Sequence, residues 1–122
     1  MIKVCQVVSD TNVGGAGRYL LNYLEYFDRT KYEVSVALPQ NSKLLEFISK
    51  YEDVKIYEVP NMADKSYDNR CVLALKKLFF KEKFDIVHTH ASLSARVAAK
   101  TTCVKTVIAT RHCIEPVGNK IV

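Results

Sequence analysis

Short β-branched runs alternate with segments of helical periodicity along this chain, and that alternation limits the possible folds more than any other feature. The runs lie at residues 2–8, 32–38, 54–59, 84–87 and 106–109, and each predicts a strand. Strands that alternate with helices build βαβ units, whose right-handed crossovers bury a parallel sheet between two helical layers. We therefore predict an α/β fold with a doubly wound parallel sheet of about five strands.

The segments between these runs predict helices. In the first segment, Ala16, Leu20, Tyr23, Leu24 and Phe27 recur at the spacing of a single apolar helix face. Further helices are expected at residues 44–48, 69–83 and 92–100. The length of 122 residues is that of one domain.

Composition excludes several classes of protein. No apolar stretch is long enough to span a bilayer, and the start MIKVCQVVSD reads as a buried strand rather than a signal peptide, which favours a cytoplasmic protein. The net charge of +5 suits an anionic ligand or surface, but the Arg-rich tract and aromatic ladder of a nucleic-acid-binding module are missing, so no nucleic-acid partner is expected. The cysteines are scattered and form no CxxC pair, which favours free thiols over disulfides or a zinc knuckle. They are Cys5, Cys71, Cys103 and Cys113.

Three of the chain's four glycines, Gly14, Gly15 and Gly17, stand between the first predicted strand and the first predicted helix. In an open parallel sheet this loop is the commonest place for an anion. We expect Gly14 and Gly15 to turn with positive φ and to approach a ligand closely. Ala16 and Gly17 keep the first helical turn free of bulk, and N–H groups exposed there favour a phosphate or a sugar hydroxyl.

Two other readings of the glycines stay open. The first is a tight turn that needs glycine for its own geometry. The second is a dinucleotide site of a nicotinamide-dependent oxidoreductase, but Gly15 and Gly17 match GxGxxG only in part because Leu20 takes the third position. The second predicted strand also ends without a carboxylate to hold a ribose, and no GK[ST] follows the glycines, which excludes a P-loop.

The three histidines, His88, His90 and His112, lie at or just beyond the ends of predicted strands. His88 and His90 share one strand face, and we expect both to look into the cleft that contains Gly15, with His90 nearer the carboxyl edge. The alternative for His90 is a structural hydrogen bond. A zinc site made by the histidines with Cys113 is a further alternative, although no carboxylate joins them.

The predicted helix at 69–83 has two apolar faces. Leu73 and Phe80 fall opposite its core face, and the lysines at 76, 77, 81 and 83 flank them. Such a helix can rest on an anionic membrane surface, and a covering loop or segment is the alternative. The expected core face consists of Cys71, Val72, Ala74, Leu75, Leu78 and Phe79.

Three motifs resemble the N-terminal half of glycosyltransferase family 4 enzymes. They are VGGAGRYLLNYLEYF at 13–27, FDIVHTHASLSARVAAK at 84–100 and VIATRHC at 107–113, and their order and spacing match across nearly all of the chain. The resemblance implies half of a GT-B architecture, in which two Rossmann-like domains face a cleft, and makes residues 1–122 the acceptor-side domain. It also implies transfer of a sugar from a nucleotide-sugar donor with retention of configuration, and without a metal or other cofactor.

The resemblance also implies roles for individual residues. Gly14 and Gly15 bring backbone N–H groups to the donor's diphosphate and sugar. His90 makes the catalytic contact with the transferred sugar, and His112 matches a family histidine whose role varies. The remaining candidate binding residues are Ala16, Gly17, Arg18 and His88.

The chain departs from the family pattern in what it lacks. Compared with the family pattern, we expect residues 1–122 to lack the donor-binding C-terminal domain and the last strands of the N-terminal domain. We expect a part of a larger enzyme of glycan, polysaccharide or glycolipid synthesis, inactive alone, with a sugar or lipid-linked acceptor and with peripheral contact at the inner membrane face. The alternative is a stand-alone Rossmann-like binding or accessory module without catalysis.

Overall fold

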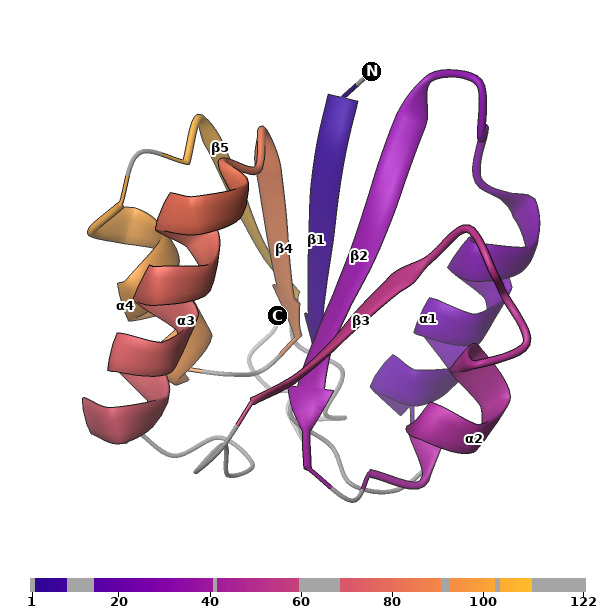
Figure 1. Cartoon of the computed structure of the whole chain (residues 1–122), viewed down its shortest axis with the longest axis horizontal. Coiled ribbons are helices and arrows are strands. Elements are labelled where there is room, and N and C mark those ends of the chain that lie inside the picture. Colours follow the sequence, from indigo (N-terminus) through magenta and orange to yellow (C-terminus); the bar gives the residue numbers. More distant parts are fainter. Residues whose placement is uncertain are drawn as a thin grey trace, which may run out of the picture.

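A computed structural model describes residues 2–8, 15–40, 42–59, 69–90, 93–102 and 104–110. They form a five-stranded parallel sheet, in the order β3-β2-β1-β4-β5, between two layers of helices (Figure 1). The predicted fold class is therefore confirmed. The strands are β1 (Ile2–Val8), β2 (Tyr32–Pro39), β3 (Lys55–Val59), β4 (Ile86–His90) and β5 (Thr106–Thr110). The helices are α1 (Gly15–Tyr26), α2 (Leu44–Ile48), α3 (Asn69–Glu82) and α4 (Leu93–Lys100).

The strand order reverses between β1 and β4, and this reversal places the helices on opposite faces of the sheet. Helices α1 and α2 cover one face, while α3 and α4 cover the other (Figure 1). Right-handed crossovers require this arrangement, because the chain moves outward from β1 to β3 and then returns to β4 on the other side. The carboxyl ends of β1 and β4 meet at the reversal, which is where open α/β sheets bind ligands.

Side chains of the central strand alternate between the two cores. Val4 and Val8 join the cluster under α1 and α2, whereas Cys5 and Val7 join the cluster under α3 and α4. Burial on both faces explains why the β1 sequence is almost continuously apolar.

The helix α3 ends one residue earlier than its periodicity predicts. Lys83 has a φ of 53°, in the left-handed region, and its N–H donates to the carbonyl of Phe79 over 2.9 Å. This is the geometry of a helix C-terminus, where the residue after the last turn reverses the chain. The next strand begins at Ile86 rather than at residue 84, and just before it the Asp85 carboxylate accepts a hydrogen bond from the Lys3 N–H over 2.9 Å.

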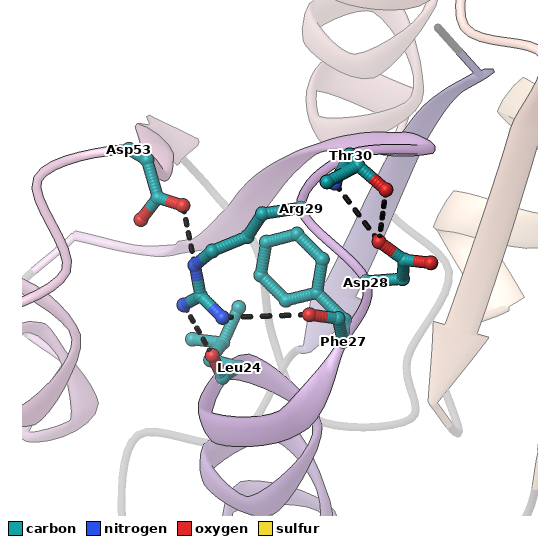
Figure 2. A network of polar contacts seen from close by, with 6 residues as sticks. All are labelled: Leu24, Phe27, Asp28, Arg29, Thr30 and Asp53. Carbon is teal, nitrogen blue, oxygen red and sulfur yellow. Dashed lines mark hydrogen bonds and ion pairs between the residues drawn. The ribbon is translucent and has the colours of Figure 1, made fainter.

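Arg29 holds the C-terminal end of α1 (Figure 2). Its Nη2 donates to the carbonyl of Leu24 over 2.6 Å, and its Nε donates to a carboxylate oxygen of Asp53 over 2.6 Å. The guanidinium also lies over the ring of Phe27, with 4.2 Å from Cζ to the ring centroid. A cation placed on the last carbonyls of a helix satisfies acceptors that have no partner within the helix.

A second local contact in Figure 2 shapes the turn that follows α1. The carboxylate of Asp28 accepts the backbone N–H of Thr30 over 2.9 Å and also the Thr30 hydroxyl. These hydrogen bonds favour the charged carboxylate, so they lower the pKa of Asp28 below its ordinary value. The turn feeds directly into β2.

Candidate functional site

The candidate site lies at the carboxyl edge of β1 and β4. Gly15 is the first residue of α1, and no described glycine has a positive φ, so the expected left-handed turn is not found at Gly15. Gly14 and His112 lie outside the described residues, as does the side chain of Ala16. The geometry of the site is therefore built from α1, β1 and β4.

Gly17 has a packing role. A Cβ at this position would lie 2.9 Å from Cδ2 of Leu44, the first residue of α2. Leu44 is fully buried, so it has little room to move away. Gly17 thus lets α1 and α2 approach closely, while its expected part in ligand binding stays a prediction.

His88 and His90 lie on the same face of β4, as their spacing predicts. They pair in register with Gln6 and Val8 of β1, and Val8 belongs to the core cluster under α1. Both imidazole rings therefore face the α1 side of the sheet. Their centroids are 4.2 Å apart.

Gln6 fixes the His90 ring. The side-chain oxygen of Gln6 lies 2.8 Å from Nε2 of His90. An amide oxygen can only accept, so Nε2 carries the proton and donates it. Burial raises the pKa of Tyr23 above its ordinary value. The Gln6 side chain also forms a hydrogen bond with Tyr23, which lowers this pKa by a smaller amount.

Tyr19 of α1 covers the histidine pair. Its ring centroid lies 5.7 Å from that of His88 and 5.1 Å from that of His90. Tyr19 is itself 40% exposed, so it forms the boundary between the histidines and solvent. It begins an aromatic row along α1 in which Tyr19, Tyr23 and Phe27 stack successively.

A groove of about 500 Å³ runs beside this aromatic row over the sheet. His88 lines the groove and is 8% exposed, whereas His90 is 1% exposed and is not among the lining residues. Within the described residues, His88 is therefore more accessible from the groove than His90 is. The lining residues are Val4, Gln6, Tyr19, Tyr23, Phe27, Asp28, Tyr32, Ile86, His88 and Ile108.

Arg18 is exposed in the first turn of α1, and that turn contains no acidic residue. The positive end of the helix dipole is thus reinforced rather than neutralised by the described side chains. An anionic group is the ligand that this helix end would attract.

The structure bears on three further expectations from the sequence: the dinucleotide site, the zinc site and the state of the cysteines. Strand β2 ends at Pro39 and is followed by exposed Gln40, so a ribose-binding carboxylate is missing there as expected. Within the described residues no three His, Cys, Asp or Glu side chains gather as metal ligands, while His112 and Cys113 lie outside them. Cys5 and Cys71 are buried thiols, and Cys103 and Cys113 lie outside the described residues.

Sequence reasoning missed Gln6, Tyr19 and Tyr23. A signal for Gln6 was present, since it is an uncharged polar side chain within an otherwise apolar central strand. A buried polar group of this kind requires a hydrogen-bonding partner. The aromatic row had a signal as well, because residues spaced by four lie on one helix face.

Comparisons with known proteins agree with this fold. The sequence model of Glycosyltransferase Family 4 matches residues 13–121. An Escherichia coli UDP-Gal:alpha-D-GlcNAc-diphosphoundecaprenol alpha-1,3-galactosyltransferase is 27% identical over 117 residues, which cover 91% of this chain and 30% of that protein. The crystal structure of a glycosyltransferase from Rickettsia africae superposes with a TM-score of 0.64 at 23% identity, covering 88% of this chain and 29% of that one, and supports the fold. Because the family match extends over most of the sequence, the chain belongs to Glycosyltransferase Family 4.

Proposed function

We propose that this chain is the acceptor-side domain of a retaining glycosyltransferase that moves a sugar from a nucleotide-sugar donor to a lipid-linked acceptor. The family match supports sugar transfer, and the name of the Escherichia coli relative supports a galactosyl donor and a diphosphoundecaprenol acceptor. The observation that carries the proposal is the place of His90. It ends β4 at the strand-order reversal, on the sheet face covered by the helix that follows the glycines.

The proposed reaction makes specific electrostatic demands on the site. The bond between the anomeric carbon and the diphosphate oxygen breaks, and its electron pair leaves with the diphosphate. The acceptor oxygen forms the new bond on the same face of the sugar, and its proton passes to the departing diphosphate oxygen. Negative charge therefore grows on the diphosphate, and fixed N–H dipoles beside it stabilise the transition state.

The start of α1 is the proposed source of those dipoles. Backbone N–H groups of Gly14 and Gly15 would face the diphosphate, and the exposed Arg18 would meet its negative charge. Removal of one such donor in other enzymes costs about 2.7–4 kcal/mol of transition-state stabilisation.

His90 is proposed to hydrogen-bond a hydroxyl of the transferred sugar, with His88 beside it at the groove. The Gln6 hydrogen bond and the Tyr19 ring hold the imidazole in one orientation before the donor arrives, which reduces the entropy lost on binding. Because His90 is nearly covered, Tyr19 is the described side chain that would shift to admit the sugar. His112 is proposed as a further contact in the same site.

A second domain is part of the proposal. The chain spans about 30% of the length of the Escherichia coli relative, so most of that protein has no counterpart here. We propose that a C-terminal domain grips the nucleotide and closes the cleft over the donor. No metal or other cofactor takes part in the proposed step.

The test uses the full-length protein with UDP-galactose and a GlcNAc-diphospholipid acceptor. We expect an α-linked product by NMR, and we expect His90→Ala to lower kcat on the order of 100-fold in protein that is still folded at the assay temperature, a loss much larger than its cost in stability. The control is Phe47→Ala, which alters an exposed ring on α2 and should leave kcat unchanged.

Three outcomes would contradict the proposal. An inverted product would remove the retaining mechanism. Parallel losses of stability and activity in His90→Ala would make the histidine structural. Binding of a nucleotide sugar without any transfer by the full-length protein would favour the accessory-module alternative.

A further inference from the structure

Helix α3 presents a second apolar surface to solvent. Leu73 and Phe80 are 57% and 68% exposed, as the helical periodicity predicts, while the buried side of the helix packs into the core. Leu73, Lys76, Lys77 and Phe80 are spaced at i, i+3, i+4 and i+7, which places them on one stripe. Together with Lys81 we call this surface the apolar–basic face.

The apolar–basic face continues onto the end of α4, which lies beside α3 in the same layer (Figure 1). Thr101 and Thr102 line a hollow of about 330 Å³ with four residues of the stripe. Their hydroxyls are already occupied, because both donate to the Ala98 carbonyl, over 3.2 and 3.1 Å. The hollow can therefore be covered by apolar groups without leaving these hydroxyls unsatisfied.

The charge of the apolar–basic face is positive. Within the described part of the chain, Lys76, Lys77 and Lys81 have no ion-pair partner. Glu82 is the only acid in α3, and it turns away to Lys3, whose Nζ lies 3.6 Å from its carboxylate. The face thus combines two exposed apolar side chains with uncompensated lysines.

We propose that the apolar–basic face docks this protein on an anionic lipid bilayer. In this arrangement α3 lies along the surface, Leu73 and Phe80 enter the boundary between headgroups and acyl chains, and the lysines contact lipid phosphates. A protein partner fits less well, because lysine is depleted from the cores of protein interfaces and two apolar residues form a small contact. No helix among the described residues has the length and hydropathy to cross a bilayer, so the proposed contact is peripheral.

Docking in this way would hold the whole protein close to the bilayer that carries a lipid-linked acceptor, while the histidine pair lies on the opposite face of the sheet from α3. The inference rests on the proposed function only for the idea that the acceptor is lipid-linked. Vesicle binding needs neither donor nor acceptor, so a failure of docking and a failure of sugar transfer are distinguishable.

The experiment is flotation of the full-length protein with vesicles of phosphatidylcholine alone or of phosphatidylcholine with phosphatidylglycerol. We expect binding to the anionic vesicles, little binding to the neutral ones, and weakening with added salt. The double variant Leu73→Ser/Phe80→Ser should bind on the order of tenfold more weakly. Lys76→Gln and Lys77→Gln should each weaken binding about fivefold.

The matched control is Phe47→Ser, which replaces an exposed aromatic side chain on α2, on the opposite face of the sheet. It should bind vesicles as the unmodified protein does, and unfolding midpoints should show that every variant is folded. Equal vesicle binding by the Leu73→Ser/Phe80→Ser variant would overturn the proposal. A dimer that this variant dissociates, without vesicle binding by the parent, would overturn it in favour of a protein interface.

Discussion

Gln6 and His90 are separated by 84 positions in the sequence, yet the Gln6 side-chain oxygen lies 2.8 Å from Nε2 of His90. The contact joins β1 to β4 across the strand-order reversal, and both side chains are buried. It therefore links the core of the sheet to the histidine pair of the candidate site.

Gln6→Met should destabilise the fold by about 1–3 kcal/mol, because it leaves the buried His90 N–H without its acceptor while keeping a similar side-chain volume. Urea unfolding measures the loss. In a double-mutant cycle with His90→Ala, the two losses should fall short of additivity by at least about 0.5 kcal/mol. Strict additivity would show that the two side chains are not coupled.

Gly17→Val should destabilise the protein by about 1–3 kcal/mol, since its side chain would overlap Leu44 in a packed core. Gly17→Ala should cost less, because the better helix propensity of alanine offsets part of the overlap. Thermal unfolding of both variants distinguishes this packing role from a backbone role. If Leu44→Ala does not relieve part of the Gly17→Val loss, the close approach of α1 to α2 is not its cause.

Lys83→Gly should stabilise the protein by about 0.5–1 kcal/mol. The residue occupies the left-handed region after α3, where a side chain costs energy and glycine does not. Chemical denaturation should show a higher midpoint for Lys83→Gly and a lower one for Lys83→Val. A lower midpoint for the glycine variant would mean that the lysine side chain contributes more than the backbone geometry.

The sequence predicts the fold well because period-2 and period-3.6 patterns follow directly from burial. Strand β1 and helix α2 have the predicted bounds, and Leu73 and Phe80 are exposed as the helical wheel requires. The main difference is at β4, where the histidines at 88 and 90 belong to the strand. Their common strand face is nevertheless the one that their spacing predicts, because both pair in register with β1.

The candidate site was less predictable because its contacts come from elements far apart in the sequence. The spacing of His88 and His90 gave their common face, but not the Gln6 hydrogen bond or the Tyr19 ring that fixes them. Gly17 illustrates the same limit, since its neighbour Leu44 belongs to another helix. Such pairings depend on tertiary packing, which a local pattern does not encode.

Alkaline pH should destabilise the protein from about pH 9 upward, and Cys5 is a major cause. Burial raises the pKa of the Cys5 thiol far above its ordinary value of 9.0, so the folded state keeps a proton that the unfolded state loses. The contribution of this thiol is therefore fully present below pH 9 and declines as the pH rises, by up to about 1.4 kcal/mol per pH unit. Tyr23, whose pKa burial raises from 10.0, should add to the slope at higher pH.

The measurement is the free energy of unfolding in urea at a series of pH values between neutrality and pH 11. Cys5→Ala should lose some stability at neutral pH, because it leaves a small cavity in the core, but it should decline less steeply above pH 9. Alkylation gives an independent check on burial of the thiols. Cys5 and Cys71 should react with iodoacetamide only after unfolding, because both are buried. An unchanged alkaline slope in Cys5→Ala would assign the pH dependence to other groups, with the half-buried Tyr23 as the first to test.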